Sequence, residues 1–181
     1  MITPLDPADY RRTPWKNGGG ITVDIAEDGE VWRFGRTPIV APGPFSDYSG
    51  FDRLQVLVAG RGLVLQTPDG EIDVRTPLRP VRFAGETPIV SRLEAGPVEV
   101  VNLIGARARV QIDLQVLQAG ASLGRGAGTL IVYAACGPAA LTFEKEAHRL
   151  AADHALRIET SQPTMIACTE GVLLLGSVIC V

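Results

Sequence analysis

The string WKNGGG, at positions 15–20, is the most unusual in the chain. Three successive glycines allow close approach of the backbone to a ligand and leave several N–H groups free to hold an anion. Lysine adds a positive charge, and asparagine offers both a donor and an acceptor. The string therefore predicts a ligand cradle, made by Trp15, Lys16, Asn17, Gly18, Gly19 and Gly20. A flexible turn before a strand, with Trp15 closing the end of a barrel, explains the same residues equally well.

Two arginines are candidates for holding an anion. Arg53 follows the strings GPFS (43–46) and GFD (50–52), and its guanidinium points either into a pocket or toward Asp52 and solvent, the commoner outcome. Arg33 lies in the string VWRFGR (31–36), where alternation along a strand puts it and Trp32 on opposite faces. One of these two faces must be the more polar.

Asn102 interrupts an apolar pattern. In VEVVNLI (98–104) it shares a face with Val98, Val100 and Ile104, where a purely structural strand favours a fourth apolar residue. A buried amide without partners costs roughly 1–3 kcal/mol. Asn102 therefore either bonds a nearby backbone turn or lines a polar cavity, and both alternatives stay open.

Catalytic and metal signals are weak. A metal site in a β-barrel needs two or three histidines and a carboxylate on converging strands, whereas the two histidines, His148 and His154, lie in one charged segment. No GxSxG motif is present, and the carboxylates are not paired in sequence. We therefore predict no metal and no cofactor, and the pattern favours a binding protein over an enzyme.

Composition excludes several classes of function. The net charge of -3 over 181 residues is spread without long runs, which argues against a nucleic-acid surface. The first residues lack the features of a signal peptide, and no apolar run approaches the ~18 residues that span a bilayer, so we expect a cytoplasmic protein without membrane contact. The three cysteines, in apolar segments, predict buried reduced thiols. The sequence does not give the oligomeric state, and a homodimer stays open.

Short β-branched stretches separated by Gly, Pro and Asp dominate the chain and predict an all-β barrel or sandwich. In ITVDI (21–25), apolar residues alternate with Thr22 and Asp24, as in an antiparallel sheet closed over a core. Weak helical periodicity leaves two candidate helices, near Asp6–Tyr10 and at 143–152, the second fitting a loop as well. The predicted strands are at 21–25, 52–58, 62–66, 71–75, 98–104, 110–117, 129–135 and 171–179.

A coarse repeat divides the chain. The pattern of strand, glycine turn and strand in VLVAGRGLVLQ (56–66) recurs in VYAACGPAALTF (132–143). Two cupin-like halves follow, residues 1–108 and residues 109–181. No linker rich in Ser, Pro or Gly separates them, so we expect them to pack as one rigid unit.

The ordered motifs WKNGGG (15–20), WRFGRTPIVAPGPFSDYSGFDRLQVLVAGRGL (32–63), RFAG (82–85) and GPVEVVNLI (96–104) resemble those of the HutD/Ves family over well over half of the chain. The resemblance implies a bicupin, two fused double-stranded β-helix barrels, in the bacterial cytoplasm. For the HutD branch it implies a non-enzymatic role in histidine utilisation, through binding formylglutamate or a related intermediate. Gly35 replaces a serine typical of the family, and Val100 an acidic residue, so the ligand can differ.

The leading prediction is therefore a metal-free binding protein for a small acidic metabolite. The enzymatic alternative is a metal-independent cupin lyase or isomerase acting on a small carboxylate. A third is a stress-related protein that acts through a protein interface. The predicted ligand-binding residues are Trp15, Lys16, Asn17, Gly18, Gly19, Gly20, Trp32, Arg33, Arg53, Phe83 and Asn102.

Overall fold

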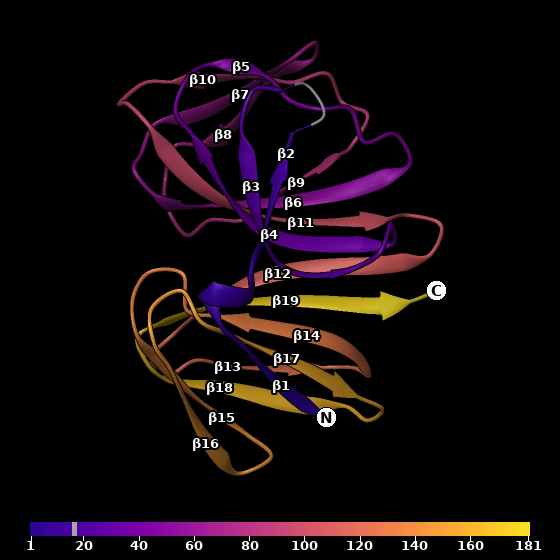
Figure 1. Ribbon diagram of the computed structural model, residues 1–181, viewed down its shortest axis with the longest axis vertical. Helices are drawn as coiled ribbons and strands as arrows, with labels where there is room; N and C mark the ends of the chain where they lie inside the picture. Colours follow the sequence, from indigo (N-terminus) through magenta and orange to yellow (C-terminus); the bar gives the residue numbers. More distant parts are fainter. Residues whose placement is uncertain (16–17) are drawn as a thin grey trace. The chain divides into compact units, whose positions relative to one another are not determined.

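The computed structural model describes residues 1–15 and 18–181, and this part of the chain is all-β apart from one short 3-10 turn. The elements are shown in Figure 1. In chain order they are β1 (Ile2–Leu5), η1 (Pro7–Asp9), β2 (Arg11–Pro14), β3 (Ile21–Asp28), β4 (Trp32–Ile39), β5 (Gly43–Pro44), β6 (Phe51–Ala59), β7 (Leu63–Thr67), β8 (Gly70–Val74), β9 (Val81–Ala84), β10 (Val90–Leu93), β11 (Val98–Ala106), β12 (Val110–Gln118), β13 (Ser122–Arg125), β14 (Gly128–Tyr133), β15 (Ala139–Phe143), β16 (Glu146–Leu150), β17 (Ala155–Thr160), β18 (Thr164–Glu170) and β19 (Val172–Cys180).

The chain forms two compact units. The first-barrel unit comprises Arg11–Arg109, and the second-barrel unit comprises Met1–Tyr10 together with Val110–Val181. The expected halves, 1–108 and 109–181, placed the first ten residues in the first half. They group with the second because β1 pairs antiparallel with β17, with Ile2 opposite Ile158. That the two halves pack as one rigid unit stays a prediction.

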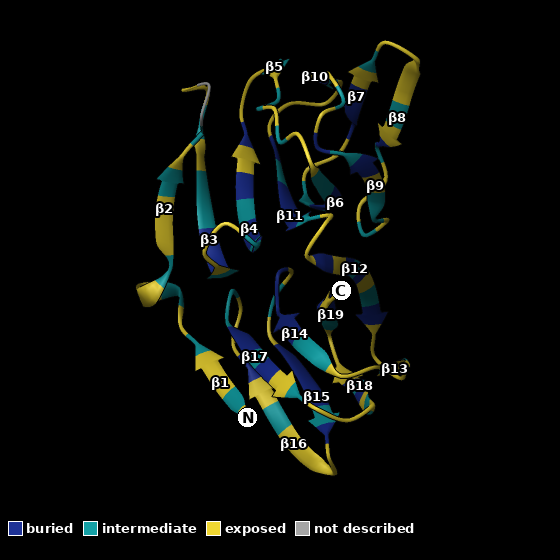
Figure 2. Cartoon of the chain, turned by 90° about the vertical axis from the view of Figure 1, so that its right-hand side faces the viewer, coloured by how far each residue is buried: buried dark blue, intermediate teal, exposed yellow. Residues whose placement is uncertain are grey.

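The first-barrel unit consists of two antiparallel sheets. The six-stranded sheet has the order β2-β3-β4-β11-β6-β9, and the four-stranded sheet has the order β5-β10-β7-β8. β11 lies between β4 and β6, so residues of these three strands meet in continuous rows across the sheet. Figure 2 shows β11 buried along most of its length, as expected for a central strand.

The second-barrel unit repeats this topology. Its five-stranded sheet has the order β1-β17-β14-β19-β12, and its four-stranded sheet has the order β13-β18-β15-β16. The strands β12, β19, β14 and β17 thus take the places that β4, β11, β6 and β9 have in the first unit. The repeat predicted from the sequence corresponds to the equivalent pairs β6–β7 and β14–β15. This duplication of one strand order is the arrangement expected for a bicupin.

The segment 143–152, for which the sequence left a helix or a loop open, contains the turn and the second strand of a hairpin. β15 and β16 pair antiparallel, joined by Glu144 and Lys145 with φ of 49° and 70°. Two consecutive residues of positive φ are typical of the tight turn that matches the twist of a hairpin. β15 also pairs with β18, and this long-range pairing overrides the weak local helical pattern. Near Asp6–Tyr10, the other candidate, only the 3-10 turn η1 forms.

Two of the three cysteines are not buried as expected. Cys168 is buried in the core of the second-barrel unit, whereas Cys136 and Cys180 are exposed. Cys136 lies in the turn between β14 and β15, and Cys180 ends β19. An apolar neighbourhood in sequence therefore did not predict burial at the ends of strands.

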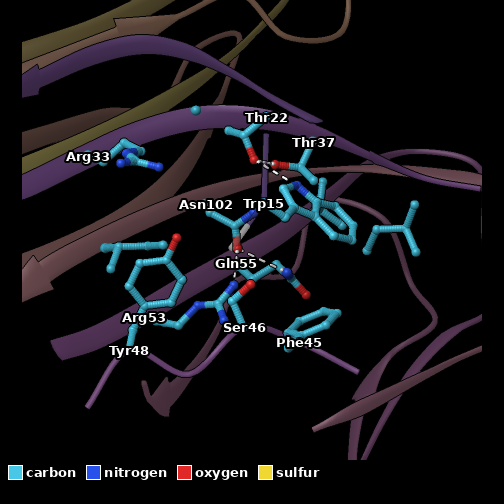
Figure 3. Close-up of a pocket in the computed structure, with 14 residues that line it drawn as sticks. Trp15, Thr22, Arg33, Thr37, Phe45, Ser46, Tyr48, Arg53, Gln55 and Asn102 are labelled. Atoms are coloured by element: carbon cyan, nitrogen blue, oxygen red, sulfur yellow. Dashed lines mark hydrogen bonds between the residues drawn. The ribbon is translucent and has the colours of Figure 1, made fainter. Parts of the chain in front are cut away.

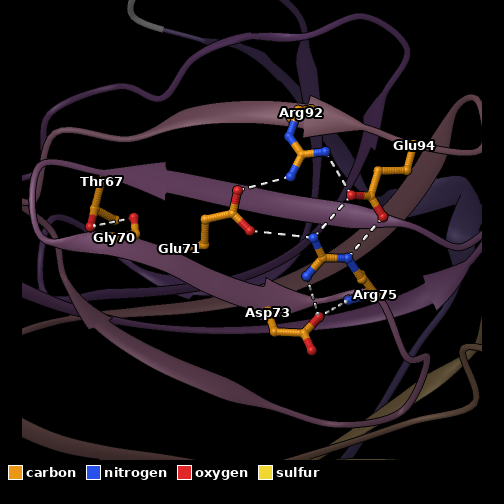
Figure 4. A network of polar contacts seen from close by, with 7 residues as sticks. All are labelled: Thr67, Gly70, Glu71, Asp73, Arg75, Arg92 and Glu94. Carbon is orange, nitrogen blue, oxygen red and sulfur yellow. Dashed lines mark hydrogen bonds and ion pairs between the residues drawn. The ribbon is translucent and has the colours of Figure 1, made fainter.

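Charged side chains cover an outer face of the four-stranded sheet in the first-barrel unit (Figure 4). Arg75 bonds Glu94 through Nε at 2.8 Å, and Arg92 bonds Glu71 at 2.9 Å. The hydrogen bonds from Arg92 and Arg75 lower the pKa of the Glu71 carboxyl. Both arginines thus have acidic partners at the surface of the unit.

Candidate functional site

A cavity opens on the inner face of the six-stranded sheet of the first-barrel unit (Figure 3). Strands β3, β4, β6 and β11 form its floor, and the segment after β5 closes one side. About 50 Å³ of the cavity is open to the centres of water-sized molecules, so its occupant must be a small molecule. The lining residues are Trp15, Thr22, Arg33, Gly35, Thr37, Ile39, Phe45, Ser46, Tyr48, Arg53, Gln55, Val100, Asn102 and Ile104.

Strand register brings the polar lining residues together. Asn102 on β11 lies between Gly35 on β4 and Gln55 on β6. One alternation further along β11, Ile104 lies between Arg33 and Arg53. Since side chains two apart share a face, these rows point into the same cavity.

Arg53 is the central charged group of the site. Only 7% of the residue is exposed, whereas a surface position was the commoner expectation. Its guanidinium carbon lies 5.1 Å from the ring centroids of Phe45 and Phe83 and 5.4 Å from that of Tyr48. Among the described residues it forms no ion pair, and its buried Nε has no hydrogen-bond partner. Burial lowers the pKa of Arg53 to about 10, so the group is still a cation at neutral pH.

Asn102 connects Arg53 to Gln55. Its side-chain oxygen accepts a hydrogen bond from Arg53 at 3.3 Å and one from the Gln55 amide nitrogen at 3.0 Å. Asn102 and Gln55 are 7% and 1% exposed. Of the two alternatives for Asn102, the structure shows the second: it lines a polar cavity.

Arg33 differs from Arg53 in having a carboxylate beside it. Its Nε lies 3.4 Å from Oδ1 of Asp24, which is buried on β3. The other oxygen of Asp24 accepts a hydrogen bond from Thr13 at 2.5 Å. The charge of Arg33 is thus compensated within the unit, and the charge of Arg53 is not.

The polar face of β3 turns inward, toward the cavity. Thr22 lines the cavity and Asp24 is buried, whereas Ile21 on the opposite face is exposed. Thr22 accepts a hydrogen bond from Trp15 Nε1 at 3.1 Å, and its hydroxyl lies 2.9 Å from that of Thr37. Polar alternation in this strand therefore marks the wall of a cavity within the barrel.

The predicted glycine cradle contributes through Trp15. Trp15 lines the cavity, whereas Gly18, Gly19 and Gly20 do not. Gly18 donates its N–H to the Trp15 carbonyl, and a Cβ at Gly20 would lie 2.9 Å from the Trp15 ring. Gly20 therefore leaves the space that the Trp15 ring occupies. Lys16 and Asn17 lie outside the described residues.

Two further predicted residues do not line the cavity. Trp32 is buried on the face of β4 opposite to Arg33, and strand alternation requires that separation. Phe83, on β9, lies beside the cavity and supports Arg53 with its ring. Gln55 was not predicted, although it lies two residues after Arg53 and therefore on the same face of β6. Other lining residues that were not predicted are Thr22, Thr37, Ile39, Phe45, Ser46 and Tyr48.

In residues 1–15 and 18–181, no three His, Cys, Asp or Glu side chains form a group that could hold a metal ion. Both histidines belong to the second-barrel unit, where His154 lies 3.5 Å from Asp6. In the same ranges, no helix has the length and apolar character needed to cross a membrane. The metal-free site stays a prediction.

Comparison with known proteins places this geometry in a family. The HutD family matches residues 7–175. An uncharacterised 21.2 kDa protein from the region 3′ of hutC in Pseudomonas putida is 31% identical over 162 residues, which cover 86% of this chain and 85% of the relative.

Two solved structures are similar over 100% of both chains at 26% identity. One is a conserved protein of unknown function from Pseudomonas aeruginosa PAO1, with a TM-score of 0.88. The other is HutD from Pseudomonas fluorescens SBW25 in a formate condition, with a TM-score of 0.83. Sequence and structure agree, and this chain belongs to the HutD family.

Proposed function

We propose that this chain binds a small acidic metabolite, formylglutamate-like in its chemistry, in the cavity of the first-barrel unit and releases it unchanged. The proposed role is regulatory, within histidine utilisation. The observation that carries the binding proposal is Arg53, a cation buried in a cavity and without an acidic partner among the described residues. A buried charge normally has a partner, and a ligand carboxylate would supply it.

The surroundings of Arg53 favour an anion over a neutral ligand. Three aromatic rings remove water from the guanidinium, which strengthens its attraction for a carboxylate. The rings and Asn102 also hold the guanidinium in place before a ligand arrives. A cation that is fixed and desolvated in advance loses little entropy on binding.

The relatives support the pathway and the choice of the first probe. The Pseudomonas putida relative is named for its place beside hutC, and the Pseudomonas fluorescens structure is named HutD and described for a formate condition. Formate is the smallest carboxylate, so it tests the anion site without any other recognition. Among the predicted ligand residues, Trp15, Arg33 and Asn102 would contact a larger acid beyond its carboxylate.

The test is calorimetric titration of the full chain with formate, formylglutamate, glutamate and urocanate. The substitution Arg53→Met should weaken the binding of these acids about ten- to a hundredfold, because a hydrogen bond to a charged group contributes about 1.5–3 kcal/mol. Arg61→Met is the matched control, since Arg61 is exposed in the same unit. Equal affinity in the wild type and Arg53→Met, or no binding of any of these acids, would refute the anion site.

Product analysis after long incubation separates binding from turnover. We expect each acid to be recovered intact, because the described cavity residues include no nucleophile activated by a neighbouring base. Conversion of an acid would instead favour the lyase or isomerase alternative.

A further inference from the structure

The cavity contains a buried hydrogen-bond acceptor without a partner. The side-chain oxygen of Gln55, Oε1, accepts no hydrogen bond from residues 1–15 or 18–181, and the residue is 1% exposed. Gln55 is one of the residues that line the cavity (Figure 3). A buried polar atom of this kind requires a partner, which ordered water or a ligand can provide.

The identity of this atom as an oxygen follows from its neighbours. An arginine side chain only donates hydrogen bonds, so the Asn102 atom that faces Arg53 must be the oxygen. The Gln55 atom facing that same oxygen must then be a donor, the amide nitrogen. The atom left without a partner is therefore the Gln55 oxygen, an acceptor. Arg53 thus determines which atoms of the Asn102 and Gln55 amides donate and which accept hydrogen bonds.

We infer that the ligand carries an N–H or O–H donor near its carboxylate, and that Gln55 selects for this donor. This inference rests on the proposed function, because Arg53 must hold the carboxylate. Arg53 and Gln55 both bond the one oxygen of Asn102, at 3.3 and 3.0 Å, so the two recognition groups are neighbours. The ligand class that fits is an acid with its donor one or two atoms from the carboxylate, such as a 2-hydroxy acid or an N-acyl amino acid.

Two pairs of acids test the inference, each differing by a methyl group that removes the donor. Glycolate is compared with methoxyacetate, and N-acetylglycine with N-acetylsarcosine, by calorimetric titration. At least one donor-bearing acid should bind about tenfold more tightly than its methylated partner, which corresponds to about 1.4 kcal/mol. Leaving a buried acceptor unpaired has a cost of this order.

Variants distinguish hydrogen bonding from the bulk of the methyl group. In Gln55→Met, which has a similar size but no acceptor, the two affinities should come within about twofold of each other. Gln66→Met, an exposed control in the same unit, should keep the tenfold preference. A preference that persists in Gln55→Met would be steric and would overturn the inference.

The outcomes separate the inference from the function on which it rests. If formate binds in an Arg53-dependent manner but neither pair shows a preference in the wild type, the inference is wrong and water serves Gln55. If no carboxylate binds at all, the proposed function fails as well. The wild-type comparison decides the inference even if Gln55→Met does not fold.

Discussion

Replacing Arg53 by methionine should make the unliganded protein more stable. Burial lowers the pKa of Arg53 to about 10, and each pKa unit corresponds to about 1.4 kcal/mol, so the buried charge costs about 3 kcal/mol. Contacts with the three aromatic rings recover about 1–2 kcal/mol of this. Methionine keeps the apolar packing and carries no charge. We therefore expect Arg53→Met to raise the free energy of unfolding by about 1–2 kcal/mol.

The direction of the Arg53 pKa shift determines how this gain in stability depends on pH. The folded protein has the lower pKa, so the unfolded chain holds the proton more tightly and the penalty is complete below pH 10. It diminishes only as the pH rises through about 10 toward the value of the unfolded chain. Between pH 6 and 9 the ionisation of Arg53 should therefore leave the difference between the wild type and Arg53→Met unchanged.

Urea unfolding and thermal melting, with and without formate, provide the assay. Without formate, Arg53→Met should melt a few degrees higher, since about 1 kcal/mol shifts Tm by about 2–4 °C in a chain of this size. With formate at a hundred times its Kd, the wild type should gain about 2.7 kcal/mol and the variant should gain little. The control Arg61→Met should stay within about 0.5 kcal/mol of the wild type. A loss of more than about 1 kcal/mol in unliganded Arg53→Met would refute the reasoning, because Arg53 would then be a structural residue.

Two further substitutions test the cavity wall. A Cβ at Gly35 would lie 2.8 Å from the Val23 carbonyl, so Gly35→Ala should destabilise the protein by roughly 1–3 kcal/mol in urea unfolding. Gly43→Ala, where a Cβ meets nothing within 4 Å, should change stability by less than about 0.5 kcal/mol, and equal losses would contradict this account. Asn102→Asp places a carboxylate near Arg53, at the present 3.3 Å contact, and should lower formate affinity at least tenfold while the protein stays folded. Unchanged formate binding in Asn102→Asp would show that the charge of Arg53 does not drive binding.

Strand alternation made much of the site predictable. The pattern of residues 98–104 placed Asn102 with Val100 and Ile104, and these three do line the cavity. The same period separated Arg33 from Trp32, which lie on opposite faces of β4. Each of these predictions concerns residues within one strand, where side chains alternate between the two faces with a period of two.

What the sequence could not predict depends on contacts between distant segments. The burial of Arg53 requires rings from Phe45, Tyr48 and Phe83, which come from loop and strand segments up to thirty-eight residues apart in the chain. The inward direction of Thr22 on β3 could not be known without the cavity, because alternation identifies two faces but not which of them is interior. The sequence therefore predicted Arg53 as a ligand-binding residue, but not that its charge is buried without an acidic partner among the described residues.

The two units share one topology but differ in the side chains that equivalent strands turn inward. In the second-barrel unit, β14 and β19 contribute Leu130, Val132, Leu173 and Leu175 to an apolar core, each at most 1% exposed. The equivalent strands of the first-barrel unit, β6 and β11, instead turn polar side chains inward, among them Arg53. Full burial of a leucine or valine stabilises a fold by about 1.5–3 kcal/mol, whereas an unpaired buried cation destabilises it. Binding of an anion would offset this cost, and for this reason we expect the recognition chemistry in the first barrel.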